Sequence, residues 1–151
     1  MCWKILKKFG YAGRGIWRCI REERHFRFHL VIAAYVLALA PYFALSRAEW
    51  AVLALTIAGV LTAEAVNSSI ERTLDRVSQE QHPLTRTAKD MAAGAVLLSV
   101  AGAVAVAIAL FWQPTVWRAV FNDWIINWYK PVLLALSAVA AIWFVGKWRT
   151  T

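Results

Sequence analysis

Five polar side chains recur at helical spacing inside a long apolar stretch of this chain. Their positions, i, i+3, i+4, i+7 and i+11, place each of them within about 60° of the first residue around the axis of an α-helix, so they share one face. They are Glu64, Asn67, Ser68, Glu71 and Asp75. An ionisable side chain at membrane depth costs on the order of 2.5–3.5 kcal/mol even on lenient scales, so two glutamates on one face favour a functional role. The alternative is a packing stripe whose carboxylates pair with Arg72 or Arg76.

The depth of the two glutamates suggests different chemistry for each. If Trp50 marks the outer membrane interface, the helical rise places Glu64 about 21 Å along a ~30 Å span and Glu71 at the opposite boundary. A buried carboxylate at the depth of Glu64 suits the acceptance of a proton from a hydroxyl group. At the boundary, Glu71 suits Mg²⁺, which takes one or two carboxylates and leaves positions for substrate phosphates.

Two further loci carry acids at the same membrane boundary. Glu22 and Glu23 precede the first apolar stretch, where the alternative is simple neutralisation of the neighbouring arginines. Lys89 and Asp90 lie near the start of the third long helix, where an acid alone often serves the helix dipole. A lysine beside these acids could neutralise a transferring phosphoryl group, so the three loci together predict chemistry on a phosphate.

The sequence lacks the usual soluble nucleotide-binding motifs. It contains no G-x-x-x-x-G-K-[ST] loop and no H-R-D or D-F-G set. The run G-Y-A-G-R-G at 10–15 follows no predicted strand, so it is interpreted as flexible backbone at the membrane surface. The three histidines, His25, His29 and His82, are too dispersed to predict a metal triad.

The elements that must position these residues are membrane helices. Of the 151 residues, 60% are apolar and 17% charged, and the apolar residues come in blocks long enough to cross a bilayer. We therefore predict an all-α membrane bundle, with a fourth C-terminal span less clearly marked than the other three. The predicted segments are an amphipathic surface helix over 3–25, loosened near its glycines, spans over 26–45, 48–74, 84–112 and 131–145, and an aromatic interfacial segment over 115–129.

Basic residues predict the orientation of this bundle. Fourteen of the 17 Lys and Arg residues fall before the first span, between the second and third, or at the C-terminus. The positive-inside rule therefore places the N-terminus and the acidic loci on the cytoplasmic side. Anionic lipid headgroups account for the net charge of +8, so no nucleic-acid partner is expected.

Four sequence runs resemble the prokaryotic diacylglycerol kinase family over about residues 4–112. They are A-E-A-V-N-S-S-I-E-R-T-L-D-R at 63–76, H-P-L-T-R-T-A-K-D-M-A-A-G-A-V-L-L at 82–98, and G-Y-A-G-R-G ahead of E-E-R-H-F-R-F-H at 22–29. The E-x-x-F-R-x-H pattern that ends at His29 looks like the undecaprenol kinase branch. The resemblance divides the chain into a kinase-like membrane domain at 1–112 and a C-terminal extension at 113–151.

The resemblance implies a lipid kinase of the bacterial inner membrane that uses ATP and Mg²⁺ and acts as a homotrimer. It implies that Glu64 is the general base, that Asn67 positions the reacting groups, and that Glu23 and Glu71 hold the metal with ATP. Residues implied to lie at the nucleotide are Glu23, Glu71, Glu80, Gln81, His82, Lys89 and Asp90. Ala12 and Lys4 depart from residues common in the family, which puts the contacts of the N-terminal helix in doubt.

Two other classes of protein compete with this interpretation. A small proton-coupled exporter also needs an intramembrane glutamate, but it needs that residue near the midplane and needs no Lys-Asp pair at the boundary. A lipid phosphatase needs a histidine nucleophile with arginine partners, and the sequence offers no such set. We therefore expect phosphorylation of a membrane alcohol, undecaprenol ahead of diacylglycerol, with the exporter as the alternative.

Overall fold

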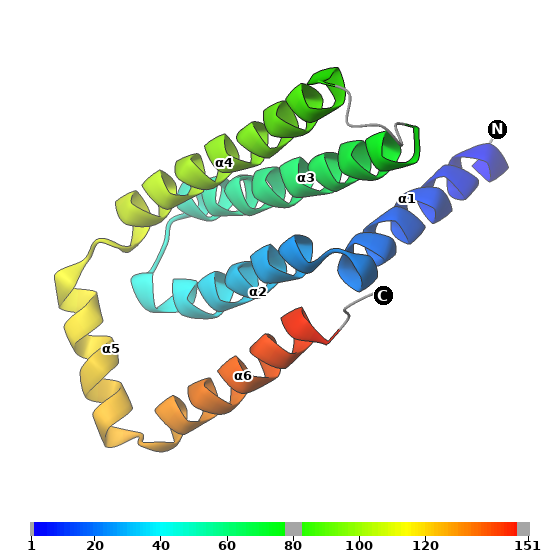
Figure 1. The fold of residues 1–151 in the computed structure, drawn as a ribbon. Coiled ribbons are helices and arrows are strands. Elements are labelled where there is room, and N and C mark those ends of the chain that lie inside the picture. Colours follow the sequence, from blue (N-terminus) through cyan, green and yellow to red (C-terminus); the bar gives the residue numbers. More distant parts are fainter. Residues whose placement is uncertain (1, 78–82, 148–151) are drawn as a thin grey trace.

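A computed structural model describes residues 2–77 and 83–147, and throughout these ranges the chain is helical with short connections (Figure 1). The all-α prediction is confirmed, including the fourth span. The elements are α1 Cys2–Glu22, α2 Arg24–Leu39, the short 3₁₀ helix η1 Ala40–Phe43, α3 Arg47–Val77, α4 Pro83–Phe111, α5 Pro114–Ile126 and α6 Tyr129–Gly146.

The centre of the bundle is α3, which packs against α4 along its length and also against α2. Helix α6 lies beside α2, and α5 crosses between the ends of α4 and α6 (Figure 1). Four segments are long and apolar enough to cross a membrane by length and composition: Arg24–Phe43, Arg47–Arg76, Pro83–Phe111 and Tyr129–Gly146. Much of their apolar surface is exposed in a single chain, as expected for helices that face lipid or further helices.

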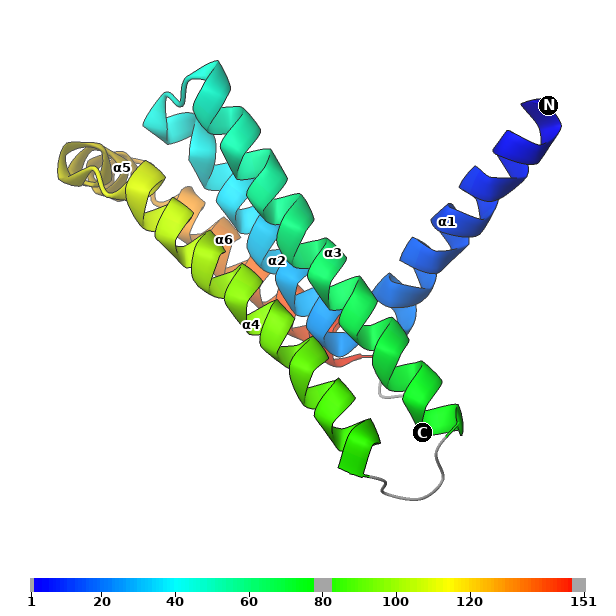
Figure 2. The ribbon, with the colours of Figure 1, turned by 90° about the horizontal axis from the view of Figure 1, so that it is seen from above.

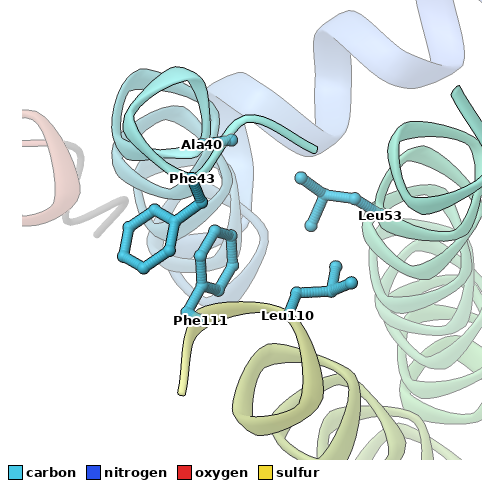
Figure 3. Packing of buried hydrophobic residues seen from close by; sticks show 5 residues of the cluster. All are labelled: Ala40, Phe43, Leu53, Leu110 and Phe111. Carbon is cyan, nitrogen blue, oxygen red and sulfur yellow. The ribbon is translucent and has the colours of Figure 1, made fainter. Parts of the chain in front are cut away.

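One end of the bundle is closed by an apolar cluster around η1. Pro41 is the second residue of this 3₁₀ turn, and Ala44 ends it with a left-handed φ of 47°. The cluster joins η1, α3 and α4 through Ala40, Phe43, Leu53, Leu110 and Phe111 (Figure 3). The rings of Phe43 and Phe111 meet edge to face at 4.9 Å, a favourable arrangement for aromatic pairs.

Local sequence explains where α3 begins. The Ser46 hydroxyl accepts a hydrogen bond from the Glu49 N–H at 3.3 Å, and the Glu49 carboxylate accepts one from the Ser46 N–H at 2.7 Å. This reciprocal capping satisfies two backbone donors that have no partner inside the helix. Helix α3 therefore starts at a fixed residue, and its polar stripe keeps a fixed depth along the bundle.

At the opposite end, α1 leaves the bundle at an angle (Figure 2). It is helical through Gly10, Gly13 and Gly15, so the expected loosening does not interrupt the helix. Glu23 is the one residue between α1 and α2, and its φ of −103° and ψ of 115° are extended. We call the turn formed by residues 19–27 the elbow.

The predicted aromatic interfacial segment forms α5. Its first residue is Pro114, and the indole N–H of Trp117 donates to the Phe111 carbonyl at 2.8 Å, which joins α5 to the end of α4. Asp123 of α5 accepts hydrogen bonds from Lys130 of α6 and from Asn127. The bond from Lys130 is the main cause that holds the pKa of Asp123 below its ordinary value of 3.8.

Candidate active site

The polar stripe of α3 lies on the buried face of that helix. Glu64, Asn67 and Ser68 are 4%, 8% and 4% exposed, while Glu71 is half-buried and Asp75 exposed. The burial of the stripe within the protein therefore falls off from Glu64 toward Asp75. A carboxylate as buried as Glu64 needs a specific reason to be there, since its desolvation is costly.

Asn67 lies between Glu64 and Glu71 along α3 and binds the half-buried Glu71. Its amide Nδ2 donates to Glu71 Oε1 at 3.0 Å, which orients the Glu71 carboxylate along α3. Its amide oxygen, Oδ1, is buried and has no hydrogen-bond partner among the described residues. A buried acceptor without a partner is rare in folded proteins, so Asn67 Oδ1 is available to a ligand donor or a cation.

Arg72 joins α3 to the elbow. Its guanidinium donates to Glu23 Oε1 at 2.6 Å and also binds Glu22. The sequence alternative, in which Arg72 neutralises the carboxylates of its own stripe, is therefore wrong for this arginine. The hydrogen bond from Arg72 is the main reason that the pKa of Glu22 lies below its ordinary value of 4.5.

The elbow brings Glu23 toward the buried glutamate. Glu64 interacts electrostatically with His25 and His29 of α2, and by like-charge repulsion with Glu71 and Glu23. Glu23 and Glu71 thus each lie within electrostatic range of Glu64, although the three residues come from two different segments. The two histidines are new members of this neighbourhood, since the sequence predicted no role for them.

Lys89 and Asp90 occupy the adjoining start of α4. Lys89 forms an ion pair with Asp75, the last member of the α3 stripe. Asp90 is 75% exposed at its side chain and lies 4.0 Å from Arg86 on its own helix. The chain therefore brings Lys89 to the stripe, while Asp90 points to solvent. The remaining predicted nucleotide residues, Glu80, Gln81 and His82, lie outside the described residues.

A cavity of about 340 Å³ lies beside Glu23 and Arg72, between α1, α2 and α3. Its polar lining includes Arg18, Glu23, Ser68, Ser69 and Arg72. Its apolar lining includes Cys19 and Phe26, and burial is the main cause that raises the pKa of the Cys19 thiol. A cavity lined by both polar and apolar side chains at the end of a membrane bundle suits an amphipathic ligand.

The acids and the amide fit a magnesium ion as a partial site. Carboxylate and amide oxygens are the hard ligands that Mg²⁺ prefers, and Glu23, Glu71 and Asn67 Oδ1 supply that type. Within the described ranges, no group of three or more His, Cys, Asp or Glu side chains is placed to hold a metal.

One residue of this region was missed by the sequence reasoning. Arg27 was counted among the basic residues of the N-terminal arm, but it is only 1% exposed. Its guanidinium donates to backbone carbonyls of Ile20, Arg21 and Val145. The available signal was its place between Phe26 and Phe28, at the first turn of an apolar span rather than in the basic arm.

The fold and the site define a membrane-embedded protein with acidic groups gathered at one boundary. A sequence model of the family described as prokaryotic diacylglycerol kinase matches residues 10–111. The chain therefore belongs to the prokaryotic diacylglycerol kinase family. It is a membrane lipid kinase with ATP as phosphoryl donor, and this membership favours the kinase interpretation over the exporter.

Individual relatives agree with the family. The undecaprenol kinase of Bacillus subtilis is 44% identical over 93 residues, which are 62% of this chain and 76% of the relative. A diacylglycerol kinase of Synechocystis is 38% identical over 73% of this chain and 63% of the relative. The diacylglycerol kinase of Escherichia coli is 30% identical over 73% of this chain and 90% of the relative.

Proposed function

We propose that this lipid kinase transfers the ATP γ-phosphate to the hydroxyl of undecaprenol, in preference to diacylglycerol, with the help of Mg²⁺. The observation that carries the proposal is the buried carboxylate of Glu64, which is 4% exposed on a membrane-spanning helix beside Asn67. A base at that depth suits a substrate whose hydroxyl is held at the membrane surface.

Two observations support undecaprenol as the lipid. The undecaprenol kinase of Bacillus subtilis matches at 44% identity, whereas the diacylglycerol kinases of Synechocystis and Escherichia coli match at 38% and 30%. The E-x-x-F-R-x-H pattern from Glu23 to His29 is similar to that branch of the family. His29 also lies within the electrostatic neighbourhood of Glu64, so the residue that marks the branch lies near the proposed base.

The proposed reaction transfers one phosphoryl group to the lipid and one proton to Glu64. The lipid hydroxyl oxygen attacks the γ-phosphorus, the bond from the γ-phosphorus to the β–γ bridging oxygen breaks, and ADP leaves. Glu64 accepts the hydroxyl proton as the attack proceeds. Asn67 holds Glu71 through its Nδ2 hydrogen bond of 3.0 Å and keeps Oδ1 for the reacting groups or the metal.

The remaining proposed roles concern the nucleotide and the metal. Glu23 and Glu71 hold Mg²⁺, which supplies charge neutralisation of the phosphates when bound. Lys89 leaves its ion pair with Asp75 and binds the phosphates. Asp90 contacts the nucleotide. Glu80, Gln81 and His82 are proposed to lie near the nucleotide on the basis of the resemblance alone. Arg72, which binds Glu23 in this structure, remains with Glu22 when Glu23 takes the metal.

The proposed setting is a homotrimer in the bacterial inner membrane, with the site on the cytoplasmic side. The distribution of Lys and Arg supports the orientation. Large exposed apolar surfaces on the spanning helices support further helix contacts, and the incomplete metal shell supports a site that a second copy completes. Residues 1–112 form the kinase domain in this proposal, and 113–151 form an extension.

A direct assay tests the proposal. Purified protein receives undecaprenol or diacylglycerol in matched micelles with γ-labelled ATP and Mg²⁺. We expect faster label transfer to undecaprenol, and loss of transfer in Glu64→Gln but not in Glu49→Gln, which changes an acid at the far end of the same helix. Transfer to diacylglycerol alone would correct the lipid, and transfer to neither would refute the proposal.

A further inference from the structure

Arg27 is a cation enclosed by the ends of three helices. It belongs to the first turn of α2, and its side chain is 1% exposed. Its Nη1 donates to the carbonyls of Ile20 at 3.2 Å and Arg21 at 3.0 Å, both in the last turn of α1. Its Nη2 donates to the carbonyl of Val145 at 3.1 Å, in the last turn of α6.

These bonds give partners to backbone carbonyls at the C-terminal ends of α1 and α6. The last four carbonyls of an α-helix have no partner inside the helix, and the aligned peptide dipoles make that end partially negative. A guanidinium offers five donors in a rigid fork, so one Arg27 side chain can serve the C-terminal ends of α1 and α6 together. These three hydrogen bonds offset part of the cost of burying the charge, while Arg27 Nε is buried without a hydrogen-bond partner among the described residues.

Glu23 lies in the backbone between the two helices that the Arg27 guanidinium joins. The Glu23 N–H donates to the Cys19 carbonyl at 3.0 Å, and the Arg27 N–H donates to the Glu23 carbonyl at 3.2 Å. Glu23 is therefore held from both sides by the two segments that the guanidinium of Arg27 joins. If α1 turned relative to α2, the side chain of Glu23 would turn with it.

Helix α6 lies outside the matched family range of 10–111, yet it contacts the elbow directly. Its Val145 carbonyl binds Arg27, and its Ser137 hydroxyl lies 3.0 Å from the Tyr35 hydroxyl in the middle of α2. Two polar ties along one apolar helix pair fix α6 both along and around α2, since each tie permits only one register.

We propose that Arg27 is a positioning residue for the kinase reaction, and that α6 supports the active site through it by fixing the elbow that carries Glu23. The inference rests on the proposed metal role of Glu23. The C-terminal extension then supplies the Val145 carbonyl as an acceptor for Arg27, and this bond helps to keep the elbow in one geometry.

The experiment uses the full chain with Cys2→Ser, so that the half-buried Cys19 is the single thiol and reports on the elbow. Arg27→Ala removes all three bonds, while Arg27→Lys keeps the charge with one donor group. Gly146→Pro turns the Val145 carbonyl away, because the residue before a proline is disfavoured in the helical region. Gly146→Ala is its matched control, since a Cβ there meets nothing within 4 Å.

Three quantities are measured: the Cys19 alkylation rate, the affinity for Mn²⁺ as a spectroscopic probe of the metal site, and separate KM values for Mg²⁺ and lipid. We expect alkylation about five- to tenfold faster in Arg27→Ala, with Arg27→Lys intermediate and Gly146→Pro above Gly146→Ala. Mn²⁺ binding should weaken and the KM for Mg²⁺ should rise in the same order, with the lipid KM unchanged.

Two results would overturn the inference. Equal alkylation rates of Cys19 in Arg27→Ala and the parent protein would show that Arg27 does not hold the elbow. Equal alkylation rates in Gly146→Pro and Gly146→Ala would show that α6 does not contribute to holding it. A failure of the proposed function looks different: Mn²⁺ affinity unchanged by Glu23→Gln would refute the metal role of Glu23, while alkylation would still report on the elbow. If Arg27→Ala does not fold, Arg27→Lys against the parent gives the same test.

Discussion

Arg72 of α3 reaches across to Glu23 of the elbow, 49 residues earlier in the chain, and its guanidinium lies 2.6 Å from the Glu23 carboxylate. The same guanidinium binds Glu22. This contact ties the surface helix to the bundle at the point where the acids of the candidate site gather. The Arg72 side chain is 43% exposed, so solvent weakens the pairing, and its energetic effect is modest.

Loss of this contact should loosen α1 without unfolding the bundle. We expect Arg72→Ala to increase hydrogen exchange of the last turns of α1 by about fivefold, the equivalent of ~1 kcal/mol for an exposed ion pair. Arg72→Lys should lie between, because it keeps one of the bonds. Arg76→Ala, one turn further along α3, is the matched control, and a similar effect from it would argue against a specific role for Arg72.

Acid should weaken the same contact. Arg72 lowers the pKa of Glu22 from its ordinary 4.5, so the pair stabilises docking of α1 above that value. The stabilisation is lost as the pH falls below 4.5 through the lowered pKa of the docked state. A spin label at Lys8 on α1 should gain mobility in this range. The transition should disappear in Arg72→Ala, and a transition that persists there would assign it to another group.

The relative positions of the site residues that share one helix could be predicted from the sequence. The spacing of Glu64, Asn67 and Glu71 predicts a shared face, and the depth estimate predicts that Glu64 is buried and Glu71 less so. Contacts between segments were not predictable in this way. The pairing of Arg72 with the elbow depends on the angle between α1 and α3, and that angle has no local sequence signal.

The fold shows the same division between local and non-local information. Apolar blocks predicted all four spans, because length and hydropathy decide whether a helix can cross a bilayer. The 3₁₀ turn at Ala40–Phe43 and the burial of Arg27 instead follow from packing among helices that are distant in sequence. The flanking Phe26 and Phe28 indicate that Arg27 stands at the start of an apolar span, but they do not identify the distant carbonyls that bind it.

Asn67 should be sensitive to a change of a single atom. Asn67→Asp keeps the size of the side chain but replaces the Nδ2 donor by an acceptor beside Glu71 Oε1, now 3.0 Å away. Repulsion should turn Glu71 aside and reduce kcat by about 10²-fold, the usual effect of misplacing a catalytic group. Thr73→Ala, at an exposed position of α3, should change kcat little. A normal kcat in Asn67→Asp would separate this hydrogen bond from catalysis.

The aromatic cluster at the far end should matter for stability rather than chemistry. Phe111→Ala removes the ring that meets Phe43 at 4.9 Å. The remaining cavity costs about 2 kcal/mol, since lipid offers little hydrophobic transfer energy and the packing term dominates. Thermal unfolding in detergent should shift downward while the KM for ATP stays constant. Phe121→Ala, at an exposed ring of α5, should shift it less; an equal shift would contradict the packing argument.

The central claim, that Glu64 takes the proton of the lipid hydroxyl, is tested most directly by single-turnover transfer from γ-labelled ATP to undecaprenol. The account predicts that Glu64→Gln slows this step by about 10²- to 10⁴-fold, the usual contribution of a general base, with ATP affinity unchanged. Transfer at the parent rate in Glu64→Gln would contradict it.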